Sequence, residues 1–309
     1  MGVMELIEPP AGDGFLDWID RPQAGPQQGP VFTYSTPEQS WLRRNLIRVV
    51  ERLSGRARFE HLYRDWAVRR DGSESVFTSA IRALEVEPEV TATDLARIPA
   101  EGPLLVVANH PYGIIDGLLI GHLISTRRAD VKLVCHALLC QPREARQVLL
   151  PIDFGPGPEA RRVSAETRRQ AAEWLDQGHV VILFPGGGVA TTPTPLARHA
   201  ADFDWHPFVA RLGRRPGVQV LAMFVHGQNS RLFQWVSHLS YPLRVALIFH
   251  ETRRRMGGQV AVSIAEPVVM ADTAKADVTA ALRRRAFAMA GPGAASAEAV
   301  FRFPGHIRF

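Results

Sequence analysis

The sequence has very little cysteine and almost no lysine. Its two cysteines, Cys135 and Cys140, exclude a disulfide scaffold and a four-cysteine zinc site, so we expect core thiols, a reducing compartment and no bound metal. Lys132 and Lys275 are the only lysines among 36 basic residues. Codon bias is the interpretation that we favour for this skew toward arginine. The alternative is phosphate contact, because a guanidinium binds phosphate through two parallel hydrogen bonds.

No secretory signal or membrane-spanning run can be recognised in the chain. The first residues are interrupted by Glu5, Glu8 and Asp13 before any apolar run develops, so we expect no signal peptide. The most apolar stretch, 102–124, is broken by polar residues and glycines and cannot form a spanning helix. We therefore expect a protein that is soluble or lies on a membrane surface.

The net charge of +5 is concentrated near the N-terminus. Residues 38–70 hold nine arginines and only four acidic residues, and the rest of the chain is balanced. A helix is predicted from Ser40, with apolar residues at three- and four-residue spacing and with Arg44, Arg48 and Arg52 along another face. Such a helix either docks on the core with a solvated arginine face or lies on anionic lipid. No recognition-helix or aromatic motif accompanies the charge, so we expect no nucleic-acid partner.

Apolar, β-branched runs alternate with helical patterns from residue 102 onward. This order predicts an α/β fold, in which a mixed, mostly parallel sheet is flanked by helices and preceded by an N-terminal helical segment. The predicted strands are 104–108, 131–135, 180–184, 218–225, 244–249 and 260–264. The predicted helices among and after them are 116–125, 159–177, 201–212 and 273–289. We expect a flexible arm, a basic amphipathic helical segment, an α/β domain and a C-terminal helix with its tail, at 1–37, 38–100, 101–272 and 273–309.

A histidine and an aspartate stand where the predicted strand 104–108 ends. Asn109-His110-Pro111 leads to Gly113, and Asp116 follows His110 by six residues. Ligands of open α/β sheets bind at the carboxyl ends of strands, and a carboxylate that orients an imidazole makes a general base. The pair can therefore transfer a proton. Alternatively, Asp116 only caps the following helix and His110 is a hydrogen-bonded turn residue.

A glycine-rich turn follows the predicted strand 180–184. It reads Pro185-Gly186-Gly187-Gly188, and successive glycines allow backbone N–H groups to form an anion-binding hollow. The alternative is a flexible turn without a ligand. The turn lacks the Gly-Lys-Ser/Thr of a P-loop and the glycine spacing of a dinucleotide fingerprint. The chain also has no Gly-x-Ser-x-Gly elbow, so a serine hydrolase would lack its nucleophile motif.

Three motifs in order carry a resemblance to a known family. Asn-His-Pro-x-Gly-x-x-Asp at 109–116, Phe-Pro-x-Gly at 184–187 and His-Gly-Gln-Asn-Ser at 226–230 each follow a predicted strand. Over residues 38–270 the chain resembles the lysophospholipid and glycerol-phosphate acyltransferases. The most similar branch is the hemolysin-like bacterial one, in which five residues separate the histidine from the aspartate. The resemblance implies an O-acyltransferase of phospholipid metabolism, whose acyltransferase domain is 101–272.

The resemblance also implies a reaction and roles for residues. A fatty acyl group would pass from acyl-CoA or an acyl-carrier protein to a hydroxyl of a lysophospholipid or related lipid, with no cofactor besides that co-substrate. His110 would remove the proton from the acceptor hydroxyl, and Asp116 would orient His110. Asn109, Gly113 and the turn formed by Pro185, Gly186, Gly187 and Gly188 would bind substrate. The amides of the turn either stabilise the oxyanion or hold the acceptor.

The glycine turn departs from the family pattern. Val189 stands where the family has the arginine that helps to hold an acceptor phosphate, which leaves the acceptor open. Basic residues between the two motifs are the substitutes we consider: Lys132, Arg143, Arg161 and Arg162. The alternative for each is a solvated or ion-paired surface residue. The altered turn also supports a second function, a non-catalytic lipid- or acyl-binding protein on the same fold.

The basic segment and the resemblance together predict a location. Residues 38–70 would attract anionic lipid headgroups and bring a lipid acceptor to His110. We therefore expect a cytoplasmic protein, peripheral on the inner face of the cell membrane. Its partners would be an anionic membrane surface, acyl-CoA or an acyl-carrier protein, and a lysolipid acceptor.

Overall fold

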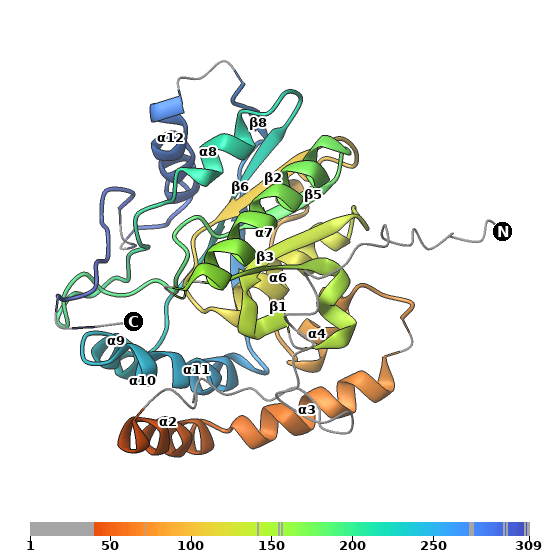
Figure 1. The fold of residues 1–309 in the computed structure, drawn as a ribbon. Coiled ribbons are helices and arrows are strands. Elements are labelled where there is room, and N and C mark those ends of the chain that lie inside the picture. The colour runs from red at the N-terminus through yellow and green to blue at the C-terminus, as the bar shows by residue number, and fades with distance from the viewer. Residues whose placement is uncertain are drawn as a thin grey trace.

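Strands and helices are arranged around one central sheet (Figure 1). The structure is a computed structural model that describes residues 40–307, except for 71, 141, 154, 156, 272–274, 293, 295 and 306. The expected flexible arm, 1–37, lies outside the described residues. The fold explains how the carboxyl end of one strand comes to hold the candidate site.

The sheet has eight strands in the part of the chain that the structure describes. They are β1 (Glu87–Glu89), β2 (Leu104–Ala108), β3 (Val131–His136), β4 (Leu149–Ile152), β5 (Val180–Leu183), β6 (Gln219–Val225), β7 (Gln259–Ile264) and β8 (Val268–Val269). Their order is β1-β7-β6-β2-β5-β3-β4, with β8 paired to β6. Among these described strands, the pairs of β6 with β7 and with β8 are antiparallel and the others are parallel. The predicted mixed, mostly parallel sheet is confirmed, and five of the six predicted strands form within one residue of their expected bounds.

The sixth predicted strand, 244–249, is wrong. This run belongs to two short helices, α10 (Tyr241–Ala246) and α11 (Ile248–Arg255). A proline in the first turn of α10 favours a helix there, because its fixed φ suits that position and its missing N–H is not needed. A short buried apolar run cannot be told from a buried helix by periodicity alone.

The other helices flank the sheet. They are α2 (Trp41–Leu53), α3 (Arg56–Arg69), α4 (Val76–Ala83), α5 (Ala92–Ala96), α6 (Ile114–Ser125), α7 (Pro158–Asp176), α8 (Phe208–Gly213), α9 (Arg231–Ser237) and α12 (Lys275–Phe287), with 3₁₀ turns η1 (Ala137–Cys140) and η2 (Arg143–Val148). The predicted helices 116–125 and 159–177 form within two residues of their bounds, and α12 lies within 273–289. The prediction 201–212 is wrong over its first seven residues. There Ala201 bridges Thr191 in a short β-contact, and α8 starts only after Pro207.

Two layers of helices cover the two faces of the sheet (Figure 1). Helices α4 and α6 pack on one face, and α7, α8 and α12 pack on the other. All five residues of β2 are buried, as expected for a central strand covered on both sides. Gly121 of α6 lets α4 come close, because an added Cβ would overlap with the ring of Phe77. This packing holds α4 and α6 together on one face of the sheet.

The basic segment near the N-terminus forms two helices along one side of the molecule (Figure 1). Helix α2 packs on α10 and α3 packs on α4, and the chain changes direction at Gly55, whose φ is +90°. Ile47 and Glu51 face inward and are buried, while four apolar side chains of α2 are exposed: Trp41, Leu46, Val49 and Leu53. The predicted helix from Ser40 is confirmed, although most of its apolar face points outward.

The segment 38–100 also takes part in the α/β layers. Strand β1 pairs in parallel with β7 at the edge of the sheet, and α4 packs against α6. The division of the chain into domains stays a prediction. Within the described ranges, no helix combines the length and the apolar composition needed to cross a membrane.

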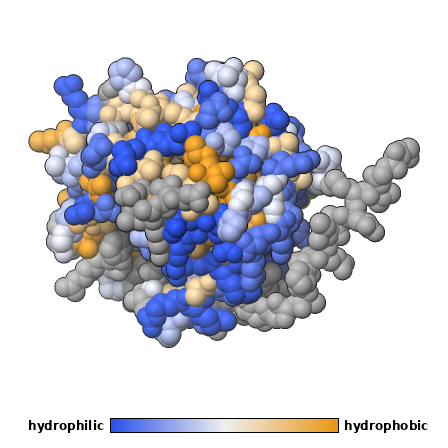
Figure 2. All heavy atoms as spheres, turned by 90° about the horizontal axis from the view of Figure 1, so that it is seen from above, coloured by the Kyte–Doolittle hydropathy of each residue, from blue (hydrophilic) through white to orange (hydrophobic). Residues whose placement is uncertain are grey.

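The surface away from α2 and α3 carries polar and apolar side chains side by side. Figure 2, which views the molecule from above Figure 1, shows a largely hydrophilic face with small hydrophobic areas. Exposed apolar side chains are not confined to α2, since Val269 of β8 and Leu239 are exposed as well.

Candidate active site

His110 and Asp116 meet where β2 ends and α6 begins. Nδ1 of His110 lies 2.9 Å from Oδ2 of Asp116, whose side chain is fully buried. The same oxygen accepts hydrogen bonds from the backbone N–H groups of Tyr112 (2.8 Å) and Gly113 (2.9 Å). Gly113 has a φ of +87°, which a side chain would strain. Asp116 thus closes the first turn of α6 and also stands beside His110. Its part in proton transfer stays a prediction.

His110 is held by its neighbours on several sides. Its ring stacks on Phe184 with centroids 4.3 Å apart. The backbone N–H of His110 donates to Oδ1 of Asp202 (3.2 Å), and its backbone carbonyl accepts from the N–H of Ala190 (2.7 Å). Burial raises the pKa of Asp202. With Nδ1 beside a carboxylate, Nε2 is the nitrogen that remains to take a proton.

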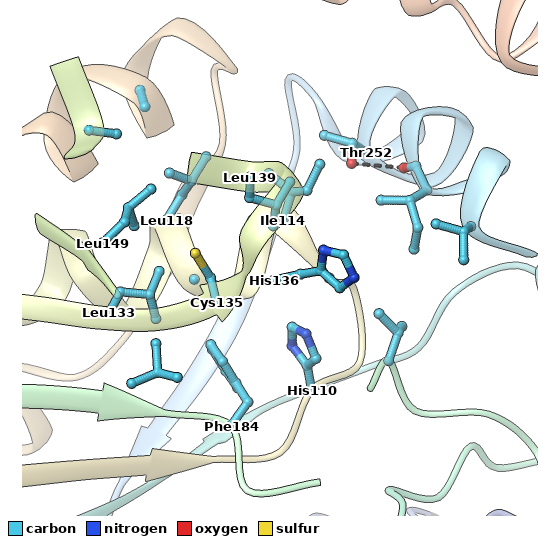
Figure 3. A pocket seen from close by; sticks show the side chains of 18 of the residues that line it. His110, Ile114, Leu118, Leu133, Cys135, His136, Leu139, Leu149, Phe184 and Thr252 are labelled. Carbon is cyan, nitrogen blue, oxygen red and sulfur yellow. Dashed lines mark hydrogen bonds between the residues drawn. The ribbon is translucent and has the colours of Figure 1, made fainter. Parts of the chain in front are cut away.

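An apolar cavity of about 660 Å³ lies beside His110. His110 and His136 point into it from the ends of β2 and β3, and Leu118, Leu133 and Leu149 line it farther along (Figure 3). Helices α3 and α4 close it on one side, and α10 and α11 on another. Pockets for small ligands have this size and a mainly apolar lining. The cavity suits an apolar chain whose reactive end lies at His110.

The glycine turn stands next to this cavity. Gly186, Gly187 and Gly188 line it, whereas Pro185 is buried beneath them. The N–H of Gly187 donates to the carbonyl of Phe184 (3.0 Å) and is therefore engaged. Within the described residues, the N–H groups of Gly186 and Gly188 have no backbone acceptor. These two amides are the donors that the turn can offer to an anionic oxygen.

Comparison with known proteins decides the family. A sequence model of the acyltransferase family matches residues 73–283. The chain belongs to the acyltransferase family. This confirms the expected enzyme class, while the hemolysin-like branch stays a prediction. The matched span of this acyltransferase includes both the turn that holds His110 and the glycine turn.

Two further comparisons were made for the acyltransferase. No curated protein matches it. Among solved structures it is similar to the crystal structure of the 1-acyl-sn-glycerophosphate (LPA) acyltransferase, PlsC, from Thermotoga maritima. The identity is 18% and the TM-score is 0.41, over 78% of this chain and 76% of that chain.

Two other predicted substrate residues of the acyltransferase lie away from the cavity. The side-chain amide of Asn109 donates to the carbonyl of Val225 (2.8 Å) and accepts from its N–H (2.7 Å), so it ties β2 to β6. The ammonium of Lys132 lies 4.0 Å from the ring centre of Trp174 on α7, on the far face of the sheet. Burial lowers the pKa of Lys132. Gly113, by contrast, lines the cavity.

The remaining predicted arginines are on the outer surface. Arg143 on η2 and Arg161 on α7 are exposed, and Arg162 pairs with Glu159 at 2.8 Å. The structure does not bring them to the cavity beside His110. Around the site, no group of three or more histidine, cysteine, aspartate or glutamate side chains placed to hold a metal occurs among the described residues.

Sequence reasoning missed two basic side chains that line the cavity, His136 and Arg244. His136, at the end of β3, points toward the cavity beside His110 (Figure 3), and burial lowers its pKa. Arg244 of α10 is buried, and its guanidinium donates to Oγ1 of Thr191 (2.5 Å) and to the carbonyl of Val189. An arginine from a distant helix thus reaches position 189, where the family pattern has its own arginine. The residues around Arg244 were predicted to form a strand. The sequence therefore did not indicate that Arg244 lines the cavity.

Proposed function

We propose that this acyltransferase moves a fatty acyl group from a thioester donor to a hydroxyl of a lysophospholipid or related lipid. The observation that carries the proposal is the contact of 2.9 Å between Nδ1 of His110 and Oδ2 of Asp116 beside an apolar cavity. His110 acts as general base and Asp116 orients it. The carboxylate favours the tautomer with its proton on Nδ1 and stabilises the imidazolium that forms.

The proposed reaction needs no covalent acyl-enzyme. Nε2 of His110 takes the proton of the acceptor hydroxyl as its oxygen forms a bond to the thioester carbonyl carbon. The C–S bond then breaks, and the leaving thiolate receives the proton from the imidazolium. The amides of Gly186 and Gly188 support this scheme in one of two ways, since they can stabilise the oxyanion or hold the acceptor.

The donor is proposed to be acyl-CoA or an acyl-carrier protein, which is the only co-substrate besides the acceptor. An apolar cavity beside the base supports an acyl chain as part of the substrate. We propose that this reaction takes place at an anionic membrane surface, on the cytoplasmic face. Support comes from α2, where exposed Trp41 and Leu53 stand among exposed arginines, a combination that favours binding to anionic lipid.

A thiol-release assay with a mixture of acyl thioesters and a panel of lipid acceptors tests the proposal. Mass spectrometry of the product identifies the acceptor and the acyl group. His110→Ala should abolish thiol release while lipid binding survives, because the substitution removes the base and leaves the cavity walls. If the purified wild-type protein binds lipid but releases thiol from none of the thioesters, it is a non-catalytic lipid-binding protein, as the altered glycine turn would allow.

A further inference from the structure

Arg244 is a buried cation at the candidate site. Its side chain on α10 is only 4% exposed. Its guanidinium donates to two neutral acceptors, Oγ1 of Thr191 and the carbonyl of Val189. Among the described side chains, no carboxylate forms an ion pair with it. Burying a charge without a counter-charge is unfavourable. A buried guanidinium without an ion pair therefore favours the binding of an anionic ligand, which supplies the missing negative charge.

Four aromatic rings fix the guanidinium in place. The rings are those of Phe203, Phe233, Phe301 and Phe303, and their centres lie 5.1 to 5.8 Å from the central carbon of Arg244. Three separate parts of the chain contribute them. Cation–π contacts compensate a buried guanidinium only in part, and burial lowers the pKa of Arg244 to about 9. The aromatic cage therefore orients the cation without neutralising it.

The cage stands next to the proposed base. Val189 and Thr191, which bind the guanidinium, flank Ala190, whose N–H donates to the carbonyl of His110 (2.7 Å). Arg244 and His110 also line the same cavity. A substrate whose hydroxyl is at His110 thus has a cation close to its polar end.

The charge of the cavity has one sign. Arg244 supplies the one arginine or lysine among the described lining residues, and no aspartate or glutamate is among them. The two histidines, His110 and His136, are the other titratable nitrogens there. An otherwise apolar cavity with one fixed positive charge is complementary to an amphiphile with one anionic group.

We propose that Arg244 binds the anionic phosphate group of the acyl acceptor and makes the enzyme prefer anionic over neutral acceptors. This inference rests on the proposed acyl transfer to a lipid hydroxyl. A phosphate held by a guanidinium forms charge-assisted hydrogen bonds, which are stronger than those between neutral groups. The cage sets the distance between the bound phosphate and His110, so it also orients the hydroxyl.

The test compares two acceptors that differ in their phosphate, lysophosphatidic acid and a monoacylglycerol with the same acyl chain. Thiol release gives kcat/KM for each in the wild type, in Arg244→Gln and in Arg244→Lys. Removing a charged hydrogen-bonding partner should lower the ratio of anionic to neutral kcat/KM about 10- to 100-fold in Arg244→Gln. Arg244→Lys, which keeps the charge but loses the bidentate geometry, should give an intermediate ratio.

Arg283→Gln is the matched control. Arg283 is also buried, stacks on Phe287 and donates to backbone carbonyls, but it does not line the cavity. It should lower the stability of the fold and keep the preference for the anionic acceptor. An equal loss with both acceptors in Arg244→Gln would mean that Arg244 only positions Val189 and Thr191. If Arg244→Gln raises the KM of acyl-CoA and leaves the KM of the acceptor unchanged, Arg244 binds the phosphates of the donor instead.

Inorganic phosphate separates this inference from the proposed function. In the wild type it should compete with lysophosphatidic acid, a measurement that needs no folded variant. If no thioester is consumed with any acceptor, acyl transfer is wrong, and calorimetric titration with phosphate still decides about Arg244. Binding in the wild type that Arg244→Gln loses supports an anion site. No binding of phosphate to the wild type overturns it.

Discussion

Among single residues, Asp116 contributes one oxygen to three contacts. Oδ2 lies beside Nδ1 of His110 and accepts the N–H groups of Tyr112 and Gly113. In Asp116→Asn the shape of the side chain is nearly kept, but the charge that stabilises an imidazolium is lost. We expect kcat for acyl transfer to fall about 10²- to 10⁴-fold, with a much smaller change in the KM of the donor, as measured by thiol release.

Asp130→Asn serves as the control for this substitution. Its carboxylate pairs with Arg128 (2.6 Å) and lies 3.1 Å from Nδ1 of His179, and none of the three residues lines the cavity. The variant should keep a kcat near that of the wild type. A wild-type kcat in Asp116→Asn would remove Asp116 from the mechanism.

Local contacts were predictable from the sequence, and distant ones were not. His110 and Asp116 are six residues apart on one turn, so their spacing alone indicates that they can meet. The side chain of Lys132 lies on the face of the sheet away from the cavity, because the pleat of β3 decides which face each side chain takes. Arg244 binds Thr191 across 53 residues of sequence. No periodicity or motif reports such a contact.

At the scale of elements, the approach of α4 to α6 depends on one glycine. A Cβ on Gly121 would overlap with the ring of Phe77, so Gly121→Ala must shift this ring or separate the helices. Overpacking of this kind costs about 1–3 kcal/mol in the free energy of unfolding, to be measured by denaturant titration. Gly291→Ala, where an added Cβ meets no atom within 4 Å, should leave the stability nearly unchanged. Equal stability in both variants would show that α4 and α6 are not packed this closely.

Helix α2 carries the predicted contact with lipid. Arg48 and Arg52 are exposed on it, and each arginine near an anionic bilayer contributes about 1 kcal/mol of binding. Replacing both with glutamine should therefore reduce the partition coefficient about 30-fold on vesicles of phosphatidylglycerol and phosphatidylcholine, as measured by sedimentation. The loss should shrink at high salt, since screening weakens the attraction in the parent protein as well.

The matched control removes the same charge from the opposite side of the molecule. Arg211 on α8 and Arg284 on α12 are exposed, and both helices lie on the side away from α2 (Figure 1). Their double replacement with glutamine should leave vesicle binding close to the wild type. Equal losses in the two double variants would mean that net charge, and not α2, determines the binding.

For the whole molecule, the sequence predicted the class of the fold. It did not predict which strands are neighbours in the sheet or which elements share the cavity. Strand β1 comes from the N-terminal segment and pairs with β7, so that Glu87 is opposite Gln259. The candidate cavity likewise joins α3 and α4 with α10, α11 and the end of β3. Hydrophobic periodicity assigns each element separately, whereas neighbours in the sheet and shared cavities follow from the packing of all of them.

The assembled cavity leads to a prediction about acyl-chain length. Ala80 of α4 lines the cavity, so Ala80→Leu fills part of it without removing any polar contact at His110. A long chain then loses room that a short chain does not need, and a change of one or two methylenes in such a pocket is worth about 1–3 kcal/mol. The ratio of kcat/KM for a palmitoyl donor to that for an octanoyl donor should therefore fall at least about tenfold. Ala57→Leu, on the exposed side of α3, adds the same side chain outside the cavity and should keep the ratio. If the ratio stays the same in Ala80→Leu as well, the acyl chain lies elsewhere and the cavity beside His110 has another ligand.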